Sequence, residues 1–461
     1  MITGNRLLLA IAAATVPSLA AGGGFTSADF PLFGPIEPNN VSHPMGYNVQ
    51  SGNPANLTVN VCIVPGSTDA AALRVPIENV VDTFNNMVPV PVNIRTASSF
   101  STAFDFESVA LHEVGHCLGL NHPNAAGESP GTTEQRESTK AIPGSNGVLN
   151  YNTGADGLFG SPDDLRGDDV NIHYFEPGVN NPFRIMREVD ATNYSIELAD
   201  LPNGDSYAAN AEREVGASAR FNVAPDDCAG GFFAANQRCA EAVMQQGTSN
   251  AEIQRALGPD DVATLLYARS GVDRIAGTGD DYTPTLVYRG ITASNCDINV
   301  SLNSAETGFG VCRTSFNSAS ANFNDAADAI AFIRSDAFFS ETTNWEFSTV
   351  RIPMPAADGA TVAPGETTVV SASVLANDVN QEGSGSLEVT TMSLGGPFAG
   401  TVDIESNGTF SYTNTDAGAT SDLFVYEVCV AGTVACAHQI VELTIDADVL
   451  DLVFRDGFER R

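Results

Sequence analysis

The segment from His112 to His122 combines three histidines and one glutamate at a spacing that suits a metal-dependent hydrolase. His112 and His116 lie four residues apart, so on a helix both imidazoles project from the same face, one turn apart. Zinc binds neutral imidazole nitrogens in a tetrahedral shell, and a catalytic zinc site keeps one position open for water. Glu113 is the adjacent carboxylate that can take a proton from an attacking water. These residues therefore predict zinc-assisted hydrolysis.

The rest of the segment makes this pattern more specific than a bare His-Glu-x-x-His, which occurs by chance in many helices. Gly119 can adopt the left-handed conformation that turns the chain sharply out of a helix. That turn brings His122 back as a third ligand. The chain has only 6 histidines, and no fourth protein ligand follows closely in the sequence. An open catalytic site is therefore favoured over a closed structural one.

The pattern His112-Glu113-x-x-His116-x-x-Gly119-x-x-His122 resembles the signature of the metzincin peptidases, which a methionine turn follows. The run from Phe104 to Glu113 is similar to the matrixin branch in particular. The resemblance implies that the three histidines bind catalytic Zn²⁺ and that Glu113 is the general base. It also implies a methionine turn beneath the ligands, for which Met244 is the candidate, with an ordinary core residue as the alternative. The segment Gly258-Pro259-Asp260-Asp261-Val262-Ala263 supports Met244, because a similar helix start follows the turn in matrixin-like chains.

The chain departs from the matrixin pattern in several places. The gap from His122 to Met244 is longer than usual, so residues 124–235 are interpreted as an insertion. A nearer turn carries Leu149 where methionine is expected. The only cysteine before the helix, Cys62, falls in a predicted strand and does not fit a cysteine-switch propeptide. The histidine spacing for a second, structural zinc is missing. The resemblance therefore supports the metzincins more firmly than any one branch.

The elements around the motif follow from hydrophobic periodicity. Alternation predicts strands over 57–64 and 90–95, and a helical period predicts helices over 70–87 and 259–270. The motif helix should begin near Asp105 and end at Gly119. The expected fold class is an α+β metzincin-like catalytic domain, with a mixed sheet plus the active-site helix, followed by an all-β region and a C-terminal β-sandwich.

At 461 residues the chain should form more than one domain. Composition and turn signals predict a signal peptide at 1–21, an irregular lead-in at 22–55, a peptidase domain at 56–282 with its insertion at 124–235, a small β region at 283–350, a β-sandwich at 356–447 and a tail at 448–461.

The predicted sandwich resembles the cadherin-like modules of bacterial exported proteins. The matching runs are Ser373-Val374-Leu375-Ala376-Asn377-Asp378 and Asn407-Gly408-Thr409-Phe410-Ser411-Tyr412. The resemblance implies an adhesion or spacer role without catalysis. Through this module the protein would contact a cell surface or the extracellular matrix.

The number of cysteines agrees with export from the cell. The signal peptide predicts a secreted or cell-surface protein, and 8 cysteines suit an oxidising compartment. Three pairs are close in sequence: Cys228 with Cys239, Cys296 with Cys312, and Cys429 with Cys436. Cys62 and Cys117 then remain, either as a fourth bridge or as two buried thiols.

Two acidic loops share the pattern Gly-x-Asp-x-x-x-Gly-x-x-Asp-Asp. Carboxylates separated by glycines suit Ca²⁺, although neither loop matches the EF-hand. Solvated acidic turns are an equally good interpretation. The candidate calcium ligands are Asp156, Asp163, Asp164, Asp273, Asp280 and Asp281.

Charge excludes some partners. With 21 basic and 56 acidic residues the formal net charge is -35, which repels nucleic acid and anionic membranes. No segment is long and apolar enough for a transmembrane helix, and a protein or peptide substrate is expected.

Two other functions stay open: a surface adhesion or binding protein with an inactive zinc-peptidase fold, and a zinc-stabilised structural domain. The intact Glu113 favours an active peptidase.

Overall fold

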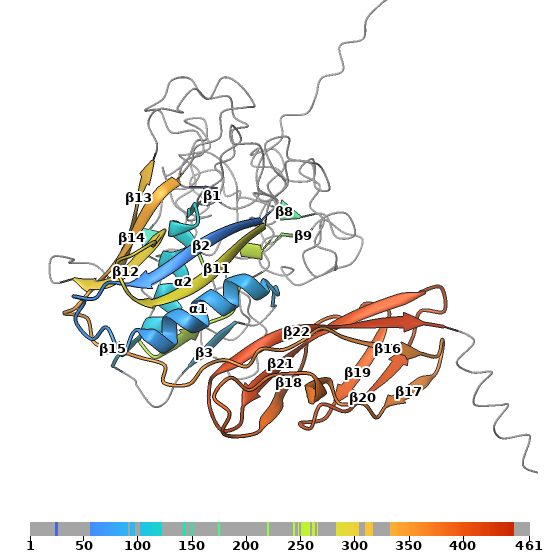
Figure 1. Ribbon diagram of the computed structural model, residues 1–461. Helices are drawn as coiled ribbons and strands as arrows, with labels where there is room; N and C mark the ends of the chain where they lie inside the picture. The colour runs from blue at the N-terminus through green and yellow to red at the C-terminus, as the bar shows by residue number, and fades with distance from the viewer. Residues whose placement is uncertain are drawn as a thin grey trace, which may run out of the picture.

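The computed structural model describes residues 24–25, 56–90, 93–96, 102–121, 142–143, 149–150, 174–175, 219–220, 243–244, 248, 250–258, 261–262, 265, 283–303, 309–316 and 332–446. The predicted signal peptide at 1–21, nearly all of the lead-in and of the insertion at 124–235, and the tail at 448–461 lie outside these residues. The described chain is mostly β-strand with few helices, and it ends in a β-sandwich (Figure 1).

A mixed five-stranded sheet forms the centre of the first unit, in the order β11-β2-β12-β14-β13. Its strands are β2 (Asn56–Ile63), β11 (Thr283–Ile291), β12 (Ile298–Asn303), β13 (Gly310–Phe316) and β14 (Phe332–Ser340). Strand β2 pairs in parallel with both β11 and β12, and β12 pairs in parallel with β14. Strand β13 is antiparallel to β14 and forms one edge of the sheet.

This pairing corrects the predicted domain boundary at residue 283. The segment 283–350 is not a separate β region, because β11 and β12 flank β2 on its two sides. The hydrophobic pattern of each strand predicts its presence but not its partner, so the joint sheet could not be read from the sequence.

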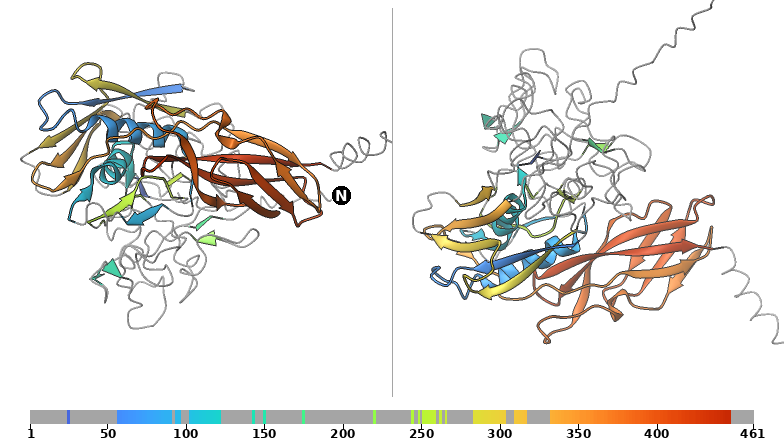
Figure 2. Two further views of the ribbon diagram at one scale, coloured as in Figure 1. Left: turned by 90° about the horizontal axis from the view of Figure 1, so that it is seen from below. Right: turned by 45° about the horizontal axis from the view of Figure 1, so that its top comes forward.

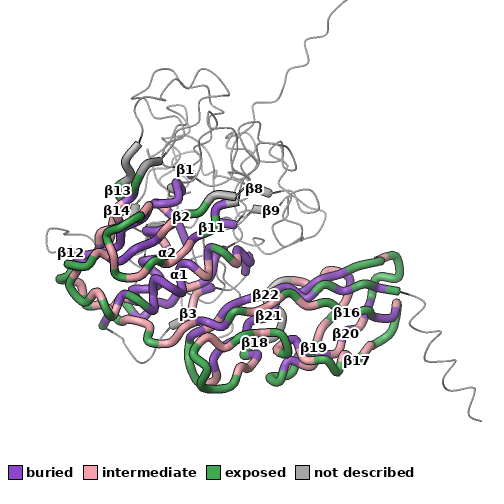
Figure 3. The backbone as a smooth tube through the Cα atoms, in the orientation of Figure 1, coloured by how far each residue is buried: buried purple, intermediate pink, exposed green. Residues whose placement is uncertain are grey.

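Two helices, α1 (Arg74–Asn86) and α2 (Phe106–Cys117), pack on one face of the sheet. Figure 2 shows both helices on the same side of the strands. Alternate residues of β2 face them, since Val59, Val61 and Ile63 are fully buried in the same hydrophobic cluster as the helices. Figure 3 shows that both helices are buried over most of their length. Helix α1 is buried without a break from Val75 to Val81 and again at Phe84, and it ends at Met87, whose φ is 50°.

Short ladders connect the remaining described segments. They are β3 (Ile94–Thr96) with β10 (Glu252–Gln254), β4 (Phe104–Asp105) with β15 (Trp345–Glu346), β1 (Gly24–Phe25) with β5 (Leu120–Asn121), β6 (Ile142–Pro143) with β7 (Leu149–Asn150), and β8 (Tyr174–Phe175) with β9 (Ala219–Arg220).

The C-terminal sandwich packs a four-stranded sheet, β16-β22-β21-β18, on a three-stranded sheet, β17-β20-β19. Its elements are β16 (Asp358–Val362), β17 (Thr367–Val370), the 3₁₀ turn η9 (Val374–Ala376), β18 (Leu387–Gly395), β19 (Gly400–Ile404), β20 (Phe410–Asn414), β21 (Ser421–Val430) and β22 (Cys436–Ile445). Tyr412, Phe424 and Tyr426 are fully buried between the sheets. The predicted sandwich at 356–447 therefore forms.

The disulfides contradict the pairing of sequence neighbours. Cys62 bonds to Cys296 and Cys117 bonds to Cys312, so the predicted bridge between Cys296 and Cys312 is wrong. Cys429 and Cys436 are bonded as predicted, whereas Cys228 and Cys239 lie outside the described residues. Cys296 and Cys312 diverge because β12 and β14 lie between β2, to which Cys296 is bonded, and β13, which carries Cys312.

The sandwich is docked on the first unit through apolar and polar contacts. Val88, Val90 and Ala256 share a buried cluster with Leu423, Val425 and Ile440 of the sandwich. Arg95 forms an ion pair with the fully buried Glu427 of β21. Among the described residues, no helix combines the length and the apolar character that crossing a bilayer requires.

A buried ion network anchors the start of α2. Arg255 donates to both oxygens of Asp105, with Nε–Oδ2 and Nη2–Oδ1 distances of 2.8 and 2.5 Å. Its Nε lies 3.8 Å from Oε1 of Glu107. Both carboxylates are almost fully buried, and burial raises the pKa of Glu107 while the Arg255 charge opposes the rise. The single positive charge of Arg255 therefore stabilises both carboxylates, whose burial without a cation would be costly.

Replacing Arg255 with methionine should lower the free energy of unfolding of the first unit by roughly 3–5 kcal/mol, because two buried carboxylates lose their cation. Urea denaturation followed by the fluorescence of Trp345, the single tryptophan, measures this change. The matched control is Arg334→Met, because Arg334 pairs with Asp336 on the surface. It should change stability by less than about 0.5 kcal/mol. Equal effects of the two substitutions would contradict the assigned role of Arg255.

Candidate functional site

Helix α2 carries His112, Glu113 and His116, and local sequence determines both of its ends. Asp105 caps the first turn, where its Oδ2 accepts from the backbone N and the hydroxyl of Ser108 at 3.1 and 2.6 Å. At the other end Gly119 has a φ of 99°, which a residue with a side chain rarely adopts. The helix thus spans the range that the sequence predicts, and the chain turns away directly after it.

The two histidine rings of α2 lie side by side. Their centroids are 4.6 Å apart and their planes are at 89°. Nδ1 of His112 lies 2.6 Å from the carbonyl oxygen of Val243, and Nδ1 of His116 lies 2.8 Å from that of Leu120. A carbonyl only accepts, so each Nδ1 carries the proton and the lone pair of each neutral ring is on Nε2. This arrangement, in which the second nitrogen is held by a backbone carbonyl, is typical of metal-binding histidines.

Met244 packs against Gly115 of the same helix. It is buried, and a Cβ on Gly115 would overlap with its sulfur and would lie 3.4 Å from its Cε. Gly115 stands between Glu113 and His116 on the helix, so the missing side chain is what permits this close approach. The structure therefore places Met244 against the histidine helix, next to Val243, whose carbonyl contacts His112. Its role as a methionine turn stays a prediction.

A buried carboxylate holds the turn that contains Met244. Asp261 accepts from the backbone N of Val243 at 2.8 Å, of Met244 at 3.2 Å and of Gly258 at 2.8 Å. Val243 in turn presents its carbonyl to His112. Asp261 thereby orients His112 through the backbone, as a positioning residue. Sequence reasoning noted only the helix start around it, because three bonds to backbone N–H groups leave no trace in residue types.

Glu113 is buried at the edge of the sheet. It is 6% exposed and points at β13, where a Cβ on Gly310 would lie 2.8 Å from its Cγ and 2.9 Å from its Oε1. Sequence reasoning missed Gly310, because the contact joins segments even further apart in the sequence than the bridged pair Cys117 and Cys312, which are 195 residues apart.

Several predicted site residues lie outside the described part of the chain. These are the third candidate zinc ligand, His122, and the candidate calcium ligands Asp156, Asp163, Asp164, Asp273, Asp280 and Asp281. The rival turn at Leu149 is described only as part of the short ladder β6–β7. Of the predicted helix at 259–270, Asp261, Val262 and Leu265 are described, and all three are helical.

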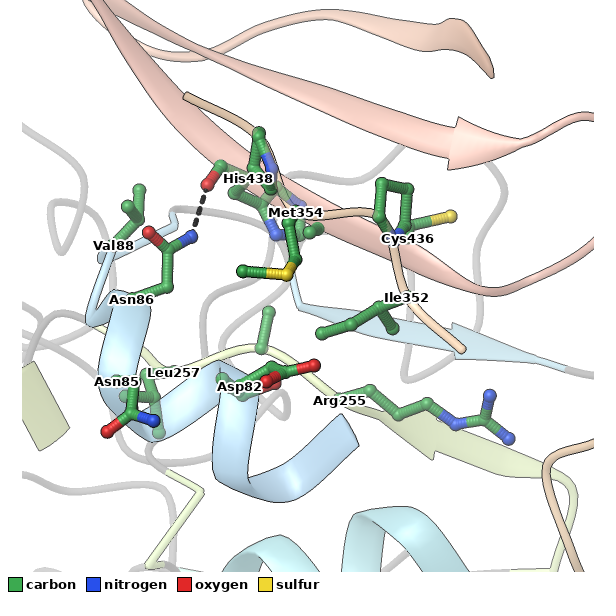
Figure 4. Close-up of a pocket in the computed structure, with 15 residues that line it drawn as sticks. Asp82, Asn85, Asn86, Val88, Arg255, Leu257, Ile352, Met354, Cys436 and His438 are labelled. Atoms are coloured by element: carbon green, nitrogen blue, oxygen red, sulfur yellow. Dashed lines mark hydrogen bonds between the residues drawn. The ribbon is translucent and has the colours of Figure 1, made fainter. Parts of the chain in front are cut away.

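A cavity of about 250 Å³ lies elsewhere, between α1, the linker at 352–355 and β22 (Figure 4). Its charged groups already have protein partners: Asp82 pairs with Arg351, and Arg255 pairs with Asp105. His438 donates from Nε2 to Glu427 at 3.0 Å, and burial with the nearby Arg95 charge lowers the pKa of His438 to about 3. These groups stabilise the junction between the two units and do not form a catalytic set.

Comparison with known proteins covers the sandwich. Residues 351–444 match the family described as bacterial Ig domain. The module is thus Ig-like, with the sandwich architecture that the expected cadherin-like module would also have. The match does not reach the histidine helix. No curated protein matches the chain at a significant level.

Two solved structures share weak similarity with the chain. They are the endo-fucoidan hydrolases MfFcnA9 and MfFcnA4 of glycoside hydrolase family 107, which are 13% and 14% identical to it. Each alignment covers 31% of this chain, but only 22% and 19% of the respective hydrolases, and has a TM-score of 0.15. A superposition this poor supports no inference about fold or activity.

The buried Asp261 predicts a pH-dependent stability. Burial raises its pKa to about 7, although its three bonds from backbone N–H groups oppose the rise. The native state then holds this proton more tightly than the unfolded state does. The contribution to stability is full below the ordinary pKa of 3.8 and is lost as the pH rises through 7.

Asp261→Asn removes this titration. We expect the stability of the natural chain, measured relative to that of the variant, to fall between pH 5 and pH 8 by an amount on the order of 2 kcal/mol. Urea denaturation of both chains at the two pH values measures the difference. A difference that is the same at both pH values would show that Asp261 stays ionised throughout.

Proposed function

We propose that the chain is a secreted zinc-dependent metalloendopeptidase that hydrolyses peptide bonds. The observation that carries the proposal is the orientation of His112 and His116, whose Nδ1 atoms are both held by backbone carbonyls beside the buried Glu113. Metal-binding histidines typically have this arrangement, because the other nitrogen must present its lone pair to the metal.

The donor set fits Zn²⁺. His112 and His116 would supply two nitrogen ligands, and His122 the third, as the resemblance to the metzincin signature implies. When bound, zinc supplies Lewis acidity to a water molecule and to the carbonyl of the scissile bond. The contact of Met244 with Gly115 agrees with the methionine turn of that family.

Glu113 would perform the proton transfers. Its carboxylate accepts a proton from the attacking water and later passes it to the nitrogen of the leaving amine. The bonds of His112 and His116 to carbonyl oxygens fix the direction of both rings, and with zinc bound their Nε2 atoms would be occupied, so Glu113 is the group beside them that gains and loses the proton.

The sheet edge at β13 offers a place for the substrate. In the described chain β13 pairs with β14 on one side and with no strand on the other. An extended peptide could add there as a further strand, which is a common mode of peptide recognition. Because Gly310 of β13 lies against Glu113, a peptide on this edge would pass close to the general base.

The cellular setting of this proposal rests on the disulfides and on the sandwich. Three bridges are present among the described cysteines, which favours an oxidising compartment and hence secretion through the predicted signal peptide. The Ig-like domain could hold the enzyme at a cell surface or in an extracellular matrix.

A second candidate function is a surface adhesion or binding protein with an inactive peptidase fold. The observation that favours it is the Ig-like domain at 351–444. The burial of Glu113 beside the two histidines argues for the enzyme, because an inactive fold gains nothing from a buried carboxylate at that position.

Glu113→Gln should abolish proteolysis while leaving the metal bound. Cleavage of casein by the mature chain should be sensitive to a zinc chelator, and the variant should lower kcat by roughly 10²–10⁴, since it removes the general base. Zinc content per chain, measured by mass spectrometry of the metal, should be unchanged because the histidines are intact.

The matched control for this experiment is Glu405→Gln, an exposed glutamate of the sandwich, which should cleave casein at the natural rate. Full activity of Glu113→Gln would refute the assignment of the base. Bound zinc without any cleavage by the natural chain would favour the adhesion protein.

A further inference from the structure

Helix α2 and strand β13 are joined at two successive levels. Glu113 and Cys117 lie one helical turn apart on α2, and Gly310 and Cys312 lie two residues apart on one face of β13. Glu113 meets Gly310, and Cys117 is bonded to Cys312 with a Cα–Cα distance of 5.5 Å. Four helical residues rise about 6 Å and two strand residues about 6.8 Å, so the two pairs stay in step.

The Cys117–Cys312 bridge is attached to β13, one of the two strands of the sheet that pair with a single neighbouring strand in the described chain. In the described chain β13 is an edge strand, so the backbone ladder to β14 holds it from one side only. At its start, Phe309 accepts a backbone bond from Ser340 at 3.0 Å, and its ring lies 4.4 Å from that of Phe104. Further along β13, the disulfide at Cys312 adds a covalent link from the strand directly to the helix that carries the histidines.

We infer that the Cys117–Cys312 bridge and Gly310 are positioning elements that fix the substrate-binding edge β13 at one distance from the base Glu113. The inference rests on the proposed peptidase function. The bridge sets how far β13 can move from α2, and the missing side chain of Gly310 leaves the space that the Glu113 carboxylate occupies.

Zinc binding by α2 and the position of Glu113 relative to β13 depend on different contacts. The rings of His112 and His116 are held by the carbonyls of Val243 and Leu120, neither of which lies on β13. Zinc binding should therefore survive a shift of β13. Catalysis should not survive such a shift, because the shift would move a peptide on β13 away from Glu113. A misplacement of about 1 Å between reacting groups can cost on the order of 100-fold in rate.

The second bridge of the same unit supplies a matched control. Cys62 lies on the face of β2 opposite Val61 and Ile63, which pack on the helices. Its bond to Cys296 therefore lies on the far side of the sheet from Glu113. Both bridges close long loops, with separations of 234 and 195 residues, so their general effects on stability should be similar.

The test compares Cys117→Ala/Cys312→Ala with Cys62→Ala/Cys296→Ala in the full-length mature chain. For a long peptide substrate we expect the first variant to lose roughly 10- to 100-fold in kcat/KM. The control should stay within about threefold of the natural chain. Zinc content should be unchanged in both. Equal kcat/KM for the two variants would overturn the inference while leaving the peptidase proposal standing, whereas a natural chain without chelator-sensitive cleavage would overturn both.

Gly310→Ala tests the same geometry with both disulfides intact, should the cysteine variant fail to fold. The added methyl group must displace the Glu113 side chain, so kcat should fall about 10-fold or more while KM and zinc content change little. Gly66→Ala is its control, because a Cβ there meets nothing within 4 Å. An unchanged kcat in Gly310→Ala would overturn the inference.

Discussion

The bond between Nδ1 of His112 and the carbonyl of Val243 is the interaction on which the rest of the site depends. It joins the helix to a segment far along the chain, and it fixes the tautomer of the ring. Behind it, Asp261 holds the N–H groups of Val243 and Met244, and Met244 fills the space that Gly115 leaves. Each of these contacts needs the next, because a tilted turn would withdraw the carbonyl from the histidine.

The chain order makes this site costly to assemble. Helix α2 precedes four of the five strands of the sheet on which it packs, and only β2 comes before it. The edge strand that meets Glu113 arrives after the long segment between β5 and β10. Contacts between such distant segments carry a large loop-closure entropy and are slow to form. The bridges Cys62–Cys296 and Cys117–Cys312 link the early and the late segments, so they stabilise the contacts that the chain order disfavours.

Local features of the site could be predicted from sequence, and nonlocal ones could not. The limits of α2 follow from Asp105 and Gly119, since a cap and a left-handed residue act within a few positions. Met244 could be chosen because the helix start after it is itself a local pattern. The disulfide partner of Cys117 could not be predicted, because spacing in sequence does not show which strand lies at the edge of a sheet. The same limit hid Gly310 and led to the separate β region at 283–350.

The position of the Ig-like domain constrains its role. It contacts α1, β3 and the segment around Ala256, through the cluster of Val88 and Leu423 and through the ion pair of Arg95 with Glu427. Arg351 adds bonds from the linker to Glu78 and Asp82 of α1. A flexible spacer would not need buried charges at its junction, because their desolvation must be offset by fixed partners. The domain is therefore mounted rigidly. Anything that it binds would be held in a defined direction relative to the histidines of α2.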